Sequence, residues 1–172
     1  MRLFQKRRVE SEIETHIPRL RRYARALCGN PDDADDLVQD CLRRALERQS
    51  LWQKGSDLRA WLFTILHNLH VDQRRYAARR PHIVDLDDVV VSRPPCQPSI
   101  VHMSEMDRFL SYLSDEHRSI LLLIGVEGVS YEEAAQILNV PKGTVMSRLS
   151  RARDQLRRLM SGEAPTALRR VK

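Results

Sequence analysis

The sequence contains 172 residues, of which 30% are charged and 5% aromatic, and its formal net charge is +6. This length allows one domain or two small ones, each with a modest hydrophobic core. The longest apolar run, residues 120–126, is too short to span a bilayer. The basic first residues are followed by acidic and polar residues instead of the apolar stretch of a signal peptide. We therefore expect a cytoplasmic protein without membrane insertion. Its basic excess is compatible with nucleic acid, an anionic membrane surface or an acidic protein, and separates none of these.

Residues 10–49 and 56–80 show helical spacing of apolar side chains, and no stretch alternates as a strand would. Pro18 is expected either to kink the first helix or to open its second half. Gly29, Asn30 and Pro31 predict a break, because they suit a helix end, an N-cap and a first turn, respectively. The predicted core positions of these three helices are Ile13, Ile17, Leu20, Ala24, Leu27, Ala34, Leu37, Val38, Cys41, Leu42, Ala45, Leu58, Trp61, Leu62, Ile65, Leu66 and Leu69.

Five aspartates and no basic residue lie between residues 31 and 40. Asp32 and Asp33 fall in a first helical turn, where carboxylates favour the helix dipole. Asp36 and Asp40 extend beyond that turn and, with Gln39 and Arg43, form an exposed stripe opposite the buried one. We interpret this stripe as a protein-docking face.

The same carboxylates could instead hold a divalent metal, as in a nuclease, but no Asp, Glu and His cluster elsewhere completes such a site. His67 and His70 could pair on a metal, although no third ligand is evident. Three scattered cysteines form no CxxC pair, which argues against a disulfide framework or a zinc site. The sequence therefore predicts no cofactor and no metal.

A basic patch ends the third predicted helix. Arginines at positions 74, 75, 79 and 80 give a charge of +4 within seven residues, and Asn68, Arg75 and Arg79 share a helical face with Asp72. Residues 81–103 then contain four of the eight prolines and little periodicity, which predicts a linker. Three valines in this linker could form a short strand or a partner-binding segment, but an extended tether fits the composition better.

The second half of the chain also predicts helices. Met106, Phe109, Leu110 and Leu113 mark one helix, Ser114 caps the next, and Ile120, Leu121 and Ile124 fill its buried side. Ser130 and Glu133 form a capping box, residues 139–141 form a turn, and the last helix covers about residues 142–160. The chain is therefore predicted to be all-α, with two small helical domains joined by a flexible linker.

The last two helices have the pattern of a helix-turn-helix. Val145, Leu149, Ala152 and Leu156 lie on one side of the last helix, spaced to pack against Ala135 and Leu138. The opposite side carries Thr144, Ser147, Arg148, Arg151 and Gln155, which suit base edges in a major groove, while Lys142 and Arg153 can hold phosphates. Six basic residues against one acid give residues 142–160 a charge of +5. A solvated basic face remains the alternative.

Three segments in order resemble the extracytoplasmic-function (ECF) group of bacterial sigma factors. "DDADDLVQDCLRRALE" is similar to the region-two helix that docks on the polymerase clamp, and "LRAWLFTILHNLHVDQRRYAARR" to the segment that recognises and melts the minus-ten element. "LSDEHRSILLLIGVEGVSYEEAAQILNVPKGTVMSRLSRARDQLRR" is similar to region four, which contacts the minus-thirty-five element. The spacing in "RRYARALCGNPDDADD" resembles the general-stress subgroup of alphaproteobacteria.

The resemblance implies a role for individual residues. Asp36, Gln39 and Asp40 would bind core RNA polymerase, and Asn68 would lie by the pocket for a flipped minus-ten base, with Trp61 supporting that helix. Ser147, Ser150 and Arg151 would occupy major-groove positions, whereas Met146 departs from the basic residue often found there. The loop at residues 50–57 takes the place of the base-capture loop, and no individual role is carried over to it.

We therefore predict a sigma factor that is not itself an enzyme. Its domains would be region two at residues 8–80, a linker at 81–103, region four at 104–161 and a tail at 162–172. Its expected partners are core RNA polymerase, promoter DNA and an anti-sigma factor. The alternatives are a sigma-mimic that binds an anti-sigma factor, an ordinary helix-turn-helix regulator and, among enzymes, a metal-dependent nuclease.

Overall fold

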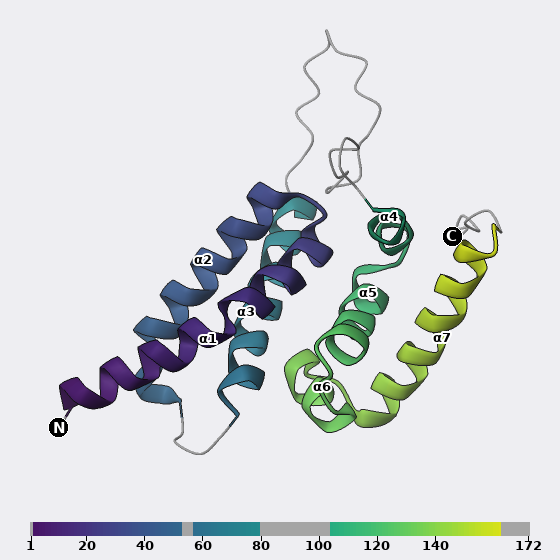
Figure 1. Cartoon of the computed structure of the whole chain (residues 1–172). Helices are drawn as coiled ribbons and strands as arrows, with labels where there is room; N and C mark the ends of the chain where they lie inside the picture. Colours follow the sequence, from purple (N-terminus) through teal and green to yellow (C-terminus); the bar gives the residue numbers. More distant parts are fainter. Residues whose placement is uncertain (1, 53–56, 80–103, 163–172) are drawn as a thin grey trace, which may run out of the picture.

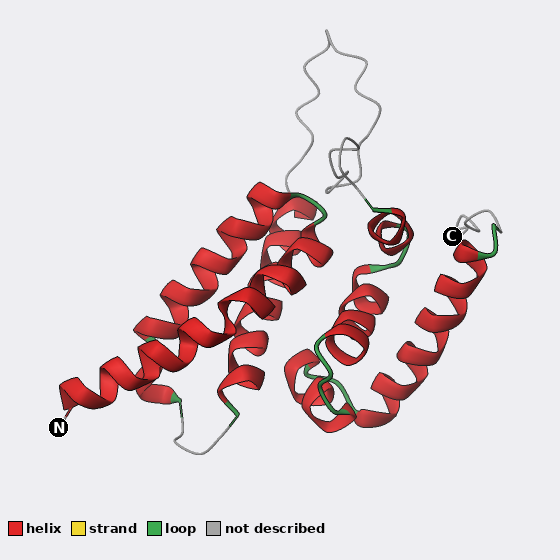
Figure 2. Cartoon of the chain, viewed as in Figure 1, coloured by secondary structure: helices red, strands yellow, loops and turns green. Residues whose placement is uncertain are grey.

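The computed structural model of the chain describes residues 2–52, 57–79 and 104–162, and every regular element within them is helical (Figure 2). The first domain contains α1 (Arg2–Cys28), α2 (Pro31–Glu47), the short 3-10 helix η1 (Gln49–Leu51) and α3 (Leu58–Arg79). The second contains α4 (Glu105–Ser111), α5 (Asp115–Leu121), the π-helical segment η3 (Leu122–Val126), α6 (Tyr131–Leu138) and α7 (Lys142–Met160). The all-α prediction is confirmed, and none of the described helices is both long and apolar enough to cross a membrane.

The predicted break between the first two helices is confirmed in detail. Gly29 has a φ of 68°, in the left-handed region that glycine tolerates, and it follows the last residue of α1. The side chain of Asn30 accepts a hydrogen bond of 2.9 Å from the backbone N–H of Asp32, which caps α2. Pro18, by contrast, lies inside α1, which the structure assigns as one continuous helix beginning at Arg2 instead of residue 10.

The first domain is a bundle of α1, α2 and α3 around an apolar core (Figure 1). Tyr23 of α1 and Phe63 of α3 meet edge to face at its centre, with ring centroids 5.1 Å apart. Most predicted core positions are buried. The exceptions are half-buried at the margin of the core: Ile17, Leu42, Trp61 and Ile65.

Side-chain caps begin three helices of the second domain. Ser104 and Ser130 each form a capping box, with Asp107 and Glu133 respectively, and Ser114 caps α5 as predicted. α6 ends at Asn139, whose φ of 51° lets the chain turn into α7. One predicted core position is wrong: Met106 is 44% exposed, because α4 turns its buried side toward α7 through Leu110 instead.

The two domains pack against each other, which the sequence did not predict. α3 contacts α6, and α1 contacts α5 and η3 (Figure 1). The predicted linker, residues 81–103, lies outside the described residues, as does the predicted tail beyond residue 162. The expectation of an adjustable tether is therefore untested, whereas the described parts of both domains share one extended contact.

Candidate nucleic-acid interfaces and acidic docking face

The outer side of α7 is the clearest candidate for a DNA-contacting surface. Val145, Leu149 and Ala152 are buried against α5 and α6, which fixes the helix and turns its opposite side outward. Ser147, Ser150 and Arg151 are exposed on that side, whereas Thr144 and Arg148 are half-buried. Short hydroxyl side chains near the N-terminal end of the helix, with an arginine behind them, have the arrangement that a major groove accepts.

Some of the predicted DNA-contacting residues of α7 have partners within the second domain. Arg148 forms an ion pair of 3.1 Å with Glu116 of α5, and Lys142 pairs with Glu132 of α6. The Ser147 hydroxyl donates a hydrogen bond of 3.1 Å to the Thr144 carbonyl. Such exposed contacts contribute little stability, so these side chains remain available to exchange them for phosphate or base contacts.

A small groove adjoins this surface. It has a volume of about 210 Å³ and lies between the start of α6 and the middle of α7, where Tyr131, Met146, Ser150 and Arg153 line it. Met146 is 52% exposed, so an apolar side chain lies among the polar side chains that are predicted to face the DNA major groove. The sequence analysis did not single out Tyr131, although it directly follows the Ser130 cap and is therefore the first residue of α6.

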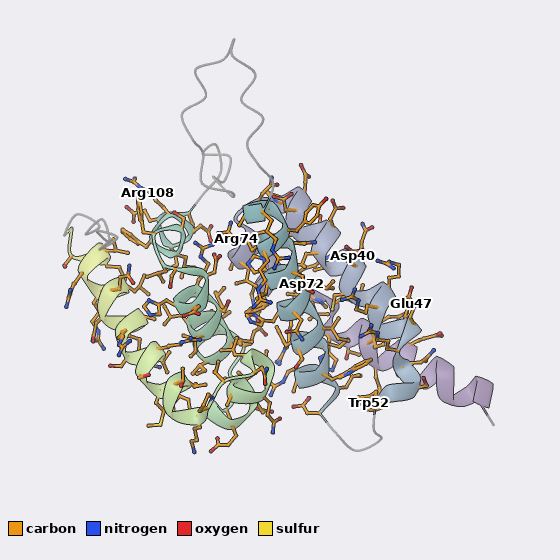
Figure 3. The ribbon with its side chains drawn as sticks, turned by 180° about the vertical axis from the view of Figure 1, so that it is seen from behind. Asp40, Glu47, Trp52, Asp72, Arg74 and Arg108 are labelled. Carbon is orange, nitrogen blue, oxygen red and sulfur yellow. The ribbon has the colours of Figure 1, made fainter. Side chains whose placement is uncertain are left out.

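The C-terminal half of α3 forms the second candidate surface. Asn68, Arg75 and Arg79 are exposed and lie on one side of the helix, as predicted. Arg74 is about 120° around the helix from Asn68, given 100° per residue. It is the nearest labelled side chain of α3 to the second domain in Figure 3, and its Nε donates a hydrogen bond of 2.8 Å to Asp115 of α5. Arg80, the last residue of the predicted basic patch, lies outside the described residues.

The acidic stripe lies on α2, a different helix from those of the two basic surfaces. Asp36 and Gln39 are exposed, and Asp40 is half-buried along the outer edge of the helix (Figure 3). Arg43 binds the Asp40 carboxylate at 3.0 Å and Glu47 at 3.4 Å, which partly neutralises the lower part of the stripe. The predicted protein-docking face is thus centred on Asp36 and Gln39 rather than spread evenly over the helix.

Of the two histidines on α3 considered as metal ligands, His67 is half-buried and His70 is buried. Burial, together with the neighbouring His70, lowers the pKa of His67 to about 4. Burial also lowers the pKa of His70, whose Nδ1 lies 4.0 Å from the Cys28 thiol. Within the described residues no three His, Cys, Asp or Glu side chains come together as possible metal ligands.

The loop between α2 and α3 is only partly described. Trp61, near the start of α3, and Trp52, on the other side of the loop, are both half-buried and pack against the core. Residues 53–56 between them lie outside the described residues. Asp57 caps α3 by accepting hydrogen bonds of 2.8 Å and 3.2 Å from the backbone N–H groups of Arg59 and Ala60.

This architecture defines a class of helical protein that combines a three-helix domain and a helix-turn-helix domain, each with an exposed basic surface on one helix. Residues 13–67 match the family described as the Sigma2 domain of PhyR, and residues 103–156 match Sigma-70, region 4. The chain is 41% identical to the ECF RNA polymerase sigma factor EcfG of Rhodopseudomonas palustris, a match that covers 88% of this chain and 84% of that protein. The chain belongs to the family of ECF RNA polymerase sigma factors.

Further relatives agree with this assignment. The chain is 34% identical to the ECF sigma factor SigL of Mycobacterium tuberculosis over 84% of each protein. Among solved structures it is similar to the sigma factor RpoE of Bartonella quintana, crystallised with the anti-sigma factor NepR, with a TM-score of 0.74, 36% identity and coverage of 91% and 98% of the two chains. The fold is also shared with PhyR in its complex with NepR, at 22% identity.

Proposed function

We propose that this chain binds core RNA polymerase and directs transcription initiation at specific promoters. The single observation that supports this most is the layout of the surface: an exposed acidic face on α2 and two exposed basic faces on separate domains, within segments that match sigma regions two and four in order. An acidic face has no use against DNA, whereas it suits a second, protein partner. The proposed domain limits remain 8–80, 81–103, 104–161 and 162–172.

Each surface has a proposed role. Asp36, Gln39 and Asp40 bind core polymerase. The α7 residues Lys142, Thr144, Ser147, Arg148, Ser150 and Arg151 contact the minus-thirty-five element. Asn68 lies by the flipped minus-ten base, and the arginines at 74, 75, 79 and 80 hold the nearby backbone, Arg74 only after it leaves Asp115.

The chain supplies promoter choice and strand opening, and nucleotidyl transfer belongs to the polymerase. Each stacked step of duplex DNA is worth about 1.4 kcal/mol on average, and extruding a base costs a few kcal/mol more. Contacts of the base pocket and of the basic end of α3 have to offset this cost. No catalytic residue is required of this chain.

An anti-sigma factor is a further proposed partner. The similar sigma factor of Bartonella quintana was crystallised with NepR. Our chain is 36% identical to that protein and matches nearly its whole length. We infer that an anti-sigma factor holds this chain inactive in the cytoplasm until a signal removes it.

The second candidate function is a sigma-mimic that binds an anti-sigma factor without contacting DNA. One observation favours it: the family matched by the first domain is described as the Sigma2 domain of PhyR. The basic side of α7 opposes it, because a pure decoy gains nothing from an exposed Arg151 beside two exposed serines.

Run-off transcription separates the two functions. Purified chain is added to core RNA polymerase on genomic fragments, and transcript starts are mapped. A sigma factor gives specific starts that share two upstream elements, whereas a decoy gives none. Specific starts without any shared upstream sequence would contradict the proposed role of α7.

Asp36→Arg tests the docking face in the same system. A reversed charge at this exposed position places like charges together or removes a favourable contact, so we expect the Kd for core polymerase to rise at least about tenfold, or about 1.4 kcal/mol. Glu14→Arg makes the same charge change at an exposed position of α1 and should leave the Kd unchanged. Unchanged binding by Asp36→Arg would refute the assignment of the docking face.

A further inference from the structure

Buried polar side chains gather where the two domains meet. Among the described residues, four polar or charged side chains are buried: His70, Arg118, Ser119 and Glu127. His70 belongs to α3, but two charged groups of the second domain act on its pKa. Asp115 raises it and Arg118 lowers it. Burial raises the pKa of Tyr23 on α1. Of two residues in the second domain, Ser119 lowers this pKa and Glu127 raises it. Apart from these groups, the buried side chains of both domains form one hydrophobic cluster, so the polar groups distinguish this part of the contact from the rest.

Arg118 of α5 connects the two domains through backbone carbonyls. Within its own domain it donates hydrogen bonds to the carbonyls of Leu110, Ser111 and Leu113, at 2.8 to 3.2 Å. Its Nη1 donates a fourth, of 2.8 Å, to the carbonyl of Leu27 at the end of α1. The last carbonyls of a helix have no partner within the helix and carry the negative end of its dipole, so they favour a cation there.

Glu127 of the second domain also contacts α1, but it accepts hydrogen bonds there, whereas Arg118 donates one. It follows the π-helical segment η3, whose wider turn is closed by a 3.0 Å hydrogen bond from the Glu127 N–H to the Leu122 carbonyl. Its carboxylate is fully buried and accepts hydrogen bonds of 2.9 Å and 2.7 Å from the Nε and Nη2 of Arg22 on α1. A buried carboxylate needs such a partner, so Arg22 stabilises the closed contact.

Two more ion pairs extend the same contact along α3. Arg59, at the start of α3, lies 3.2 Å from Glu133 of α6, and Arg74 near its end lies 2.8 Å from Asp115 of α5. Fifteen residues separate these arginines, which is about 22 Å of helix. Three arginines of the first domain therefore meet three carboxylates of the second, and each arginine keeps part of its surface in solvent, from 20% to 55%.

We propose that this contact is a reversible latch that holds the two domains closed in the free protein and that must open before both promoter elements can be bound. Polar interfaces between domains resemble those of transient complexes, because each separated group recovers its hydrogen bonds from water.

The need to open follows from size and rests on the proposed function. Elements centred at minus ten and minus thirty-five are about 25 base pairs apart, or ~85 Å at 3.4 Å per base pair. A compact chain of this length has a radius of gyration of about 16 Å. The closed protein is therefore too small to contact both elements on straight DNA. Opening also frees Arg74 from Asp115, so the latch withholds one of the arginines proposed to hold the minus-ten backbone.

Small-angle X-ray scattering of the full chain without polymerase or DNA tests the latch. Arg74→Glu places two carboxylates together, and Asp115→Arg places two cations together. Each should raise the radius of gyration by at least about 3 Å above that of the closed chain. The double variant with both changes restores an opposite-charge pair and should return to the wild-type value. Arg22→Glu, which faces the buried Glu127, should expand the chain independently of this pair.

Glu116→Arg is the matched control, because it makes the same change one residue away, where the carboxylate pairs with Arg148 inside the second domain. It should leave the radius unchanged, and circular dichroism should show that every variant keeps its helical content. The milder Arg74→Gln replaces any variant that loses helicity. Equal radii throughout, expansion by Glu116→Arg, or failure of the double variant to reclose would overturn the latch. Expansion as expected without specific initiation in the run-off assay would leave the latch standing and remove the proposed function.

Discussion

The two helices proposed to face DNA, α3 and α7, lie in different surroundings. α3 is enclosed by α1 and α2 on one side and by α6 on another, so only its C-terminal stretch beyond His67 presents an exposed side. α7 lies at the outer edge of the second domain and presents an exposed side along its whole length (Figure 1). On α3 the position of an arginine around the helix determines whether it is exposed to a DNA partner. On α7 most arginines are exposed.

The largest expected difference between the two helices concerns stability. Leu66 of α3 is fully buried in the first core, so Leu66→Ala should lower the free energy of unfolding by about 2 to 5 kcal/mol. Leu156→Ala makes the same truncation at a half-buried position of α7 and should cost less than half as much. Urea denaturation followed by helical circular dichroism measures both losses. Equal losses would show that α7 is as deeply enclosed as α3.

Selectivity should depend on α7. Arg151 is exposed in the middle of the proposed groove-facing side, and a good base-edge contact from an arginine gives about 1 to 3 kcal/mol of discrimination. Arg151→Ala should therefore reduce the preference of the holoenzyme for an intact minus-thirty-five element by roughly 5- to 150-fold. Competition between intact and altered promoters measures this ratio. Arg158→Ala, an exposed arginine in the last turn of the same helix, should leave it unchanged, and equal effects would place the contact outside the base edges.

Lowering the pH should reduce the free energy of unfolding through a histidine of α3, because α7 contains no histidine. Burial depresses the pKa of His67 to about 4 in the folded state, so the unfolded chain binds a proton more readily below pH 6.5. This residue's contribution is complete above about pH 6.5 and falls as the pH decreases toward 4. From pH 7 to pH 5.5 the expected loss is about 1 kcal/mol.

The histidine can be isolated by substitution. His67→Gln removes its titration, so the unfolding free energy of the variant should change about 1 kcal/mol less over that interval than the wild-type value. Urea midpoints at the two pH values provide the comparison. His70, whose pKa is also lowered, remains in both proteins and adds the same trend to each. An identical pH dependence in the two proteins would show that His67 titrates alike in the folded and unfolded states.

Local signals in the sequence predicted the helices and their ends. The caps at Asn30, Ser114 and Ser130 depend only on nearby residues, and the structure confirms each of them. The exposed sides of α2 and α7 also followed from helical periodicity. Periodicity gives the angle of a side chain around its own helix, which is all that these assignments needed.

Contacts between the domains could not be predicted in this way. Glu127 and Arg22 are 105 residues apart, and nothing in either neighbourhood indicates that they meet. The pairing of Arg74 with Asp115 likewise separates Arg74 from the other arginines of its patch, although they are adjacent in sequence. Met106 was misplaced because a seven-residue helix has too few turns to define its buried side from spacing alone.

The smallest expected effect sharpens the difference in how α3 and α7 bind DNA. Arg75→Ala removes one exposed cation from α3, and if that cation holds a phosphate, the holoenzyme should bind all promoters slightly more weakly, by less than about 1 kcal/mol. The slope of log K against log salt should fall in magnitude by about one. Arg48→Ala, at the exposed end of α2, should leave the slope unchanged. A loss at Arg75 that varied with the promoter sequence, as expected for Arg151, would mean that α3 also distinguishes bases through its arginines, and the division between the two helices would be wrong.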